Sequence, residues 1–169
     1  MSSLQVDSIS SMGGGHVDGA GKVVQCVYHQ WNVGTVTTSN SFGPAADSKI
    51  SFTPKFANSL LVIIYEFFLT AEWLSGSIET GGAFKILHDG TYIQDVAARF
   101  ELYTNASADS LSIGAVAFAR QMKINSVAAG NTSARDIELH FATYAPTGNR
   151  VTVNRNSNYS NLLVQEIAQ

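Results

Sequence analysis

The stretch "NSLLVIIYEFFLT", residues 58–70, decides the fold class because it is apolar on both faces. The residues from Leu60 to Tyr65 are all apolar, Glu66 interrupts them, and the apolar run resumes up to Leu69. A β-strand with one face in water alternates apolar and polar residues, and this segment does not. Its Ile, Val, Tyr and Phe residues favour a strand over a buried helix. We therefore expect a strand that is covered on one face by its own domain and on the other by a second subunit.

A membrane is a poor candidate for the second cover. A spanning helix needs about 20 apolar residues, and this run is shorter and carries Glu66 near its middle. The first 22 residues have no basic start followed by an apolar core, so we expect no secretion signal. The sequence therefore predicts no membrane insertion.

The composition points to one domain with few charges. The chain has 169 residues, of which 45% are apolar and 14% are charged, whereas a soluble domain typically has about 25% charged residues. Such a chain either has a surface of small polar residues or hides much of its surface in an assembly. The net charge of −3 gives no electrostatic reason to expect a nucleic acid or an anionic membrane as a partner.

The rest of the chain is a series of short strand patterns separated by Gly-, Asn- and Ser-rich turns. Asp89-Gly90 marks a tight hairpin turn within residues 83–96, and Gly114 marks a bulge in a long strand. Residues 115–122 have a helical alternative. The pattern predicts an all-β sandwich or jelly roll over residues 22–169. The expected strands are residues 22–31, 48–54, 58–70, 98–104, 110–124, 135–144, 149–155 and 161–168, together with the hairpin.

The residues that could form motifs for catalysis, cofactor binding or metal binding do not have the spacing that these motifs require. "GAGK" at residues 19–22 lacks the first glycine and the final Ser or Thr of a phosphate-binding loop. Glu138 and His140 share one face of a strand, which favours a surface or interface hydrogen bond over an acid–base pair. Cys26 lies between apolar residues and is expected to be a buried structural thiol. We therefore expect no enzyme activity, no cofactor and no metal site. The histidines, which lack ligand spacing, are His16, His29, His88 and His140.

Residues 1–21 form a separate segment with its own pattern. Leu4, Val6 and Ile9 lie on a polar background, and a glycine-rich stretch follows. One interpretation is a disordered tail. The other is an arm that adds to the sheet of a partner, with Leu4, Val6 and Ile9 as anchors. The hinge of this arm would be Gly13, Gly14, Gly15, Gly19 and Gly21.

The order of several motifs resembles a group of small phage virion proteins. These motifs are "MSSLQVDSIS" at the start, "KVVQ", "SFTPKFANSLLV" and the ending "LLVQEIAQ". The group is common in phages of marine bacteria and cyanobacteria and is described as structural or tail-fibre-like. More distantly, the pattern is similar to trimeric jelly rolls of the tumour-necrosis-factor and complement globular-head type. The chain departs from the complement type in having no collagen repeat, and from long tail fibres in having no shaft region.

The resemblance implies a homotrimeric virion protein that is made in the host cytoplasm. The expected function is a capsid decoration (cement) trimer that binds the major capsid protein or a tail component through residues 1–21. The alternative is a receptor-binding tip of a tail fibre that recognises a host surface glycan through residues 74–82 and 154–160. The residues expected in the subunit interface or the core are Leu61, Ile63, Ile64, Tyr65, Phe67, Leu162 and Val164.

Overall fold

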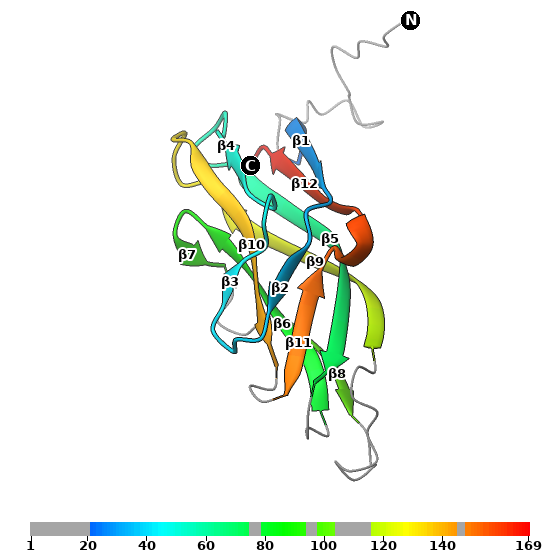
Figure 1. The fold of residues 1–169 in the computed structure, drawn as a ribbon. Coiled ribbons are helices and arrows are strands. Elements are labelled where there is room, and N and C mark those ends of the chain that lie inside the picture. The colour runs from blue at the N-terminus through cyan, green and yellow to red at the C-terminus, as the bar shows by residue number, and fades with distance from the viewer. Residues whose placement is uncertain (1–20, 75–78, 94–97, 104–115, 145–147) are drawn as a thin grey trace, which may run out of the picture.

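The chain folds into two β-sheets packed face to face (Figure 1). The structure, a computed structural model, describes residues 21–74, 79–93, 98–103, 116–144 and 148–169. All of its regular elements are strands apart from one short 3-10 turn, η2 (Arg155–Ser157). The predicted all-β sandwich of jelly-roll type is therefore confirmed.

Sheet A is built around the long strand β5 (Leu60–Trp73). On one edge, β5 pairs with β12 along its first half and with β11 along its second half. On the other edge, it pairs with β9 without a break in register from Leu60 to Glu72. β1 extends the sheet beyond β12, and β2 extends it beyond β11. The bounds are β1 (Val23–Trp31), β2 (Thr35–Thr37), β9 (Val116–Ala128), β11 (Asn149–Val153) and β12 (Ser160–Ile167).

Sheet B covers the inner face of sheet A and is centred on the antiparallel pair β6 and β10. β3 and β4 pair with β10, and β7 and β8 pair with β6. In Figure 1, β10 and β7 lie to the left, and β1 and β12 lie at the top. The bounds are β3 (Gly43–Pro44), β4 (Ile50–Phe52), β6 (Glu79–His88), β7 (Thr91–Tyr92), β8 (Ala98–Tyr103) and β10 (Arg135–Thr143).

The core lies between the sheets and is lined by alternate residues of the central strands. From sheet A it takes the odd-numbered residues of β5, from Leu61 to Ala71, and Tyr65 donates a hydrogen bond of 2.9 Å to the carbonyl of Ser48. From sheet B it takes Phe84 and Ile86 of β6 and the apolar odd-numbered residues of β10. The inner face of β5 is thus covered by this chain itself, as the sequence predicts.

Two further sequence predictions can be compared directly with the structure. The hairpin at Asp89-Gly90 is confirmed: both residues have positive φ, at 50° and 77°, and Leu87 pairs with Tyr92 across the turn. The helical alternative for residues 115–122 is wrong where the structure describes it, because β9 begins at Val116 and pairs with β5 residue by residue.

The prediction that Cys26 is a buried thiol is wrong, because its side chain is exposed. Cys26 pairs with Gln165, and its β1 neighbour Tyr28 is also exposed on the outer face of sheet A. Apolar neighbours along a strand do not show which of its faces is covered.

The N-terminal segment is described only at its end. Leu4, Val6, Ile9 and the glycines from Gly13 to Gly19 lie outside the described residues, and so does Gly114. Gly21 has a φ of 79°, and its N–H donates to the carbonyl of Ala168 at 2.7 Å. The segment therefore joins the sandwich beside the C-terminal end of β12.

Candidate functional site

The outer face of sheet A carries a row of apolar side chains that crosses four strands. Tyr28 of β1 pairs with Leu163 of β12, Leu163 with Ile64 of β5, and Ile64 with Ile124 of β9. Tyr28 is 61% exposed and Ile124 is 57% exposed, and Met122 beside this row is 62% exposed. Ile64 and Leu163 between them are half-buried. We call Tyr28, Leu163, Ile64, Ile124 and Met122 the outer row.

The outer row follows from the residue pattern of the strands. Successive side chains of a strand point to opposite faces, so the inward direction of Ile63 sends Ile64 outward. Ile63 has no exposed surface, whereas Ile64 is half-buried. Because β5 is apolar at both parities, it fills the core with one set of side chains and presents the other set on the outer face.

A chain of hydrogen bonds crosses the same face beside the outer row. Arg120 Nε donates to Glu66 Oε1 at 2.6 Å, and Asn161 Nδ2 donates to Glu66 Oε2 at 3.1 Å. Asn161 Oδ1 in turn accepts from the Tyr28 hydroxyl at 2.8 Å and from Gln30 Nε2 at 3.0 Å. The hydrogen bond from Arg120, then that from Asn161, lowers the pKa of Glu66 below its usual value, so the carboxylate stays ionised at neutral pH. The polar groups of this face therefore satisfy one another, and its charges cancel.

A second ion pair lies further along the same face. Arg150 Nε donates to Glu72 Oε2 at 2.9 Å, and the second Arg150 nitrogen donates to Oε1 at 2.6 Å. Arg155 lies 3.5 Å from the same carboxylate. The hydrogen bond from Arg150 lowers the pKa of Glu72. Charge on this part of sheet A is thus also paired.

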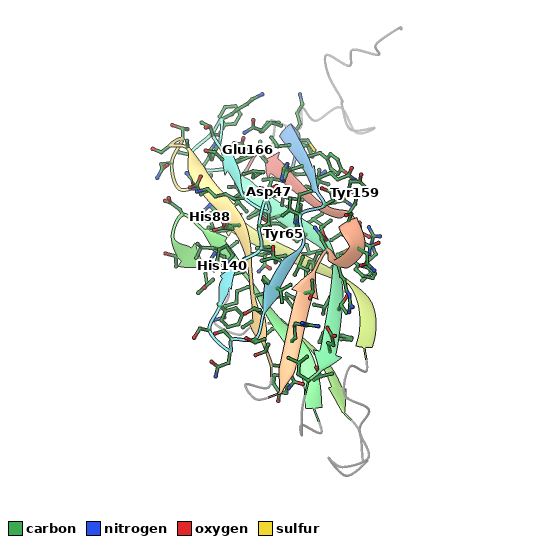
Figure 2. The ribbon with its side chains drawn as sticks, viewed as in Figure 1. Asp47, Tyr65, His88, His140, Tyr159 and Glu166 are labelled. Carbon is green, nitrogen blue, oxygen red and sulfur yellow. The ribbon has the colours of Figure 1, made fainter. Side chains whose placement is uncertain are left out.

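One end of the sandwich is closed by the buried carboxylate of Glu166 (Figure 2). It accepts hydrogen bonds of 2.9 Å from the backbone N–H groups of Lys55 and Phe56, 2.7 Å from the Ser59 hydroxyl and 2.6 Å from Gln25 Nε2. Burial by itself would raise the pKa of Glu166, but these hydrogen bonds outweigh it and hold the pKa below its usual value. The carboxylate therefore anchors the crossover from β4 in sheet B to β5 in sheet A.

The structure divides the predicted interface or core residues between two environments. Ile64 points outward and belongs to the outer row. The remaining residues are fully buried between the sheets: Leu61, Ile63, Tyr65, Phe67, Leu162 and Val164. Sequence reasoning missed Tyr28, Leu163, Met122 and Ile124, because no local pattern shows which face of β1, β12 or β9 the core covers.

Among the described residues, the structure brings together one residue pair that the sequence analysis considered for acid–base chemistry. Glu138 and His140 form a hydrogen bond of 3.0 Å on the outer face of β10. Among the described residues no group of three or more His, Cys, Asp or Glu side chains is placed to hold a metal ion. Within the same ranges, no helix has the length and apolarity needed to span a membrane. Of the two loops predicted to bind a glycan, residues 75–78 lie outside the described residues, and residues 154–160 contain η2 and the exposed Tyr159.

Comparison with known proteins finds no sequence family and only distant structural similarity. No protein-family model matches the chain, and no curated protein matches it in sequence. Among solved structures, it is similar to latent PorU from Porphyromonas gingivalis, with a TM-score of 0.42 and 16% identity, covering 97% of this chain and 14% of that one. This chain thus spans only a small part of PorU.

Two further structures show the same distant likeness. Eiger TNF from S. frugiperda has a TM-score of 0.38 and 7% identity over 79% of this chain and 91% of that one. The VP2 protein of infectious bursal disease virus has a TM-score of 0.37 and 12% identity over 98% of this chain and 41% of that one. The all-β sandwich is shown by the strand pairing of this chain itself, and these structures resemble it only distantly.

Proposed function

We propose that this chain is a structural protein of a phage particle and that it assembles as a homotrimer through the outer face of sheet A. The observation that carries the proposal is the outer row, an apolar stripe across four strands with more than half of the Tyr28, Met122 and Ile124 side-chain surface in water. Contiguous apolar patches on a soluble protein mark surfaces that bind another protein or a membrane. Obligate subunit interfaces are of this kind and resemble a core cut in half.

The polar groups of the face favour a second copy of the chain as the partner. Glu66 is neutralised by Arg120, and Asn161 joins both to Tyr28. Burying an unpaired charge is costly, whereas a face whose charges are already paired can meet an identical face without leaving one unpaired. Beside the outer row the charges of Glu66 and Arg120 cancel, and further along the face Arg150 and Arg155 share Glu72 and leave one positive charge. Self-association accordingly uses the outer row without adding new ion pairs.

The virion setting and the role of the arm rest on the sequence resemblance. Residues 1–21 are proposed to attach the trimer to a capsid or tail protein by adding a strand to its sheet, with Leu4, Val6 and Ile9 as anchors. Ordering the arm costs roughly 1–2 kcal/mol per residue in backbone entropy, so backbone pairing with a partner is needed to hold it. The segment leaves the sandwich at Gly21, at one end of sheet A.

Light scattering on the purified full chain tests the assembly. The wild type should have the mass of a trimer at micromolar concentration, and Ile124→Asp should give a folded monomer with unchanged circular dichroism. The matched control is Val33→Asp, at an exposed apolar residue of the β1–β2 loop outside the outer row, which should remain trimeric. A folded wild-type monomer, or equal dissociation of both variants, would contradict the proposal.

Deletion of residues 1–15 tests the arm separately. The truncated protein should remain trimeric and should no longer bind the phage particle in a sedimentation assay, in which the full chain does bind. Binding at full-length occupancy, or loss of the trimer, would show that the arm is not the attachment segment.

A further inference from the structure

The outer face of sheet B holds a cation between two aromatic rings. Lys85 Nζ lies 4.9 Å from the ring centroid of Phe42 and 4.8 Å from that of Tyr92. The two ring centroids are 6.0 Å apart, and the planes are tilted by 59°. All three side chains are half-buried. Among the described residues, Lys85 has no carboxylate within ion-pair distance, so its charge is stabilised by the rings and remains available to an anion.

Neighbouring polar groups hold one of these rings in place. The Tyr92 hydroxyl lies 3.1 Å from His140 Nδ1, and His140 Nε2 lies 3.0 Å from Glu138 Oε2. One neutral tautomer serves both contacts, with Nε2–H donating to the carboxylate and Nδ1 accepting from the hydroxyl. The Tyr92 and His140 rings also meet edge to face, with centroids 5.6 Å apart. The ring is thus fixed by packing and by hydrogen bonds before any ligand binds, as a binding surface requires.

The backbone pairing places all of these groups on one face. His140 pairs with Lys85 on one side and with Pro44 on the other, and Leu87 pairs with both Glu138 and Tyr92. Figure 2 shows His140 on the β10 side of the sandwich, away from β12. Beside this group, Lys49 forms an ion pair with Asp136 of β10 at 2.5 Å, and its charge also interacts with that of Glu138. Lys85 therefore remains the available cation of this surface among the described residues.

We propose that Phe42, Lys85, Tyr92, Glu138 and His140 form a binding site for an acidic sugar residue of a polysaccharide. The two rings match the C–H face of a pyranose, and the Lys85 ammonium matches a sugar carboxylate. Glu138 Oε1, which has no hydrogen-bond partner among the described residues, accepts from a sugar hydroxyl. An acidic peptide would satisfy Lys85 and could donate backbone N–H groups to the Glu138 carboxylate, but it lacks the C–H face of a pyranose ring.

This site goes beyond the proposed assembly and does not depend on it. It lies on sheet B, so self-association through the outer face of sheet A leaves it exposed. Its residues come from the segment before β3 and from β6, β7 and β10. It therefore differs from the loops at residues 74–82 and 154–160 that the sequence favours for glycan recognition.

Binding of the full chain to a glycan array tests the proposal first. The array carries oligosaccharides that end in hexuronic or sialic acids beside their neutral counterparts. The full chain should bind at least one acidic glycan more strongly than its neutral counterpart. Equal binding of acidic and neutral glycans, or no binding, would overturn the proposal.

Titration of the best acidic glycan then assigns the site. Lys85→Gln and Tyr92→Leu should each weaken binding tenfold or more, while Lys22→Gln, at an exposed lysine just before β1 of sheet A, should leave it unchanged. Circular dichroism and the trimer mass should match those of the wild type in all three variants. If Lys22→Gln weakens binding as much as Lys85→Gln, or if a Glu-rich peptide of equal charge binds as tightly as the glycan, the assignment is wrong.

Discussion

The outer faces of the two sheets differ in how their charges are placed. On sheet A, Glu66 and Arg120 are joined into a hydrogen-bonded chain beside an apolar row of which Tyr28, Met122 and Ile124 are exposed among the described residues. On sheet B, Lys85 sits between two rings with no carboxylate partner among the described residues. A face with paired charges and surplus apolar surface is suited to burial against protein, and one with an available cation beside rings is suited to a polar ligand. The two sheets of this sandwich are therefore suited to different partners.

The largest effect should separate the two faces of β5 itself. Ile63 is fully buried and Ile64 is half-buried on the outer row. Ile63→Asp places an unpaired charge in the core and should cost several kcal/mol, enough to unfold the chain. Ile64→Asp should leave the subunit folded and abolish the trimer. Thermal unfolding and light scattering distinguish these outcomes, and unfolding by both variants to the same extent would show that Ile64 is a core residue.

The next effect concerns the carboxylate that ties the two sheets together. Glu166→Gln should lower the free energy of unfolding by about 3 kcal/mol, because a charged acceptor with several donors is lost. Gln25→Ala, which removes one of those donors, should cost about 1 kcal/mol and serves as the control. Urea unfolding monitored by Trp fluorescence measures both.

Lowering the pH should also distinguish the wild type from Glu166→Gln. The folded pKa of Glu166 is lower than its unfolded value, so its contribution is fully present above about pH 4.5 and is lost as the pH falls below it. The wild type should therefore lose more stability than Glu166→Gln on acidification through this range. A parallel decline of the two would show that the carboxylate does not contribute in its ionised form.

A smaller effect should show whether the ion pair between Arg120 and Glu66 becomes buried in the subunit interface. In the free subunit, Arg120→Gln should change stability by about 0–1 kcal/mol, because the Arg120 side chain is half-exposed. In the trimer, the same change leaves Glu66 unpaired and should weaken association tenfold or more, about 1.4 kcal/mol. Adding Glu66→Gln should restore part of the loss. Sedimentation equilibrium measures both variants beside the wild type, and an Arg120→Gln trimer of wild-type affinity would place the pair outside the interface.

The smallest effect is expected on sheet B. Lys49 and Asp136 form an ion pair at 2.5 Å with both side chains half-exposed. The pKa of Lys49 is raised by its hydrogen bond to Asp136, but solvent screens such a pair. Lys49→Gln should change neither the unfolding midpoint nor the trimer mass measurably. Dissociation of this variant would show that sheet B, rather than sheet A, carries the interface.

The fold could be predicted further than the site. Strand and turn patterns identify β5, β10, β12 and the Asp89-Gly90 hairpin, because their side-chain alternation and turn residues are local properties. The short strands β2 and β3 were missed, since Thr35–Thr37 and Gly43–Pro44 are too short to show a pattern. Glu138 and His140 were predicted to hydrogen-bond because they lie two residues apart on one strand. Phe42, Lys85 and Tyr92 are far apart in the sequence, and nothing local relates them.

The residue pattern alone predicts that β5 is apolar on both faces and that the chain is an all-β sandwich. It could not determine whether the odd- or the even-numbered side chains of β5 face the core. Both sets are apolar, and a shift of one residue in register exchanges them. The tertiary structure decided this by pairing β5 with β12 and β9 and by packing Leu61, Ile63 and Tyr65 against sheet B. That choice left Ile64 beside Tyr28, Leu163 and Ile124 on the outer face. Pairing between strands distant in the sequence, rather than any local pattern, therefore created the apolar row.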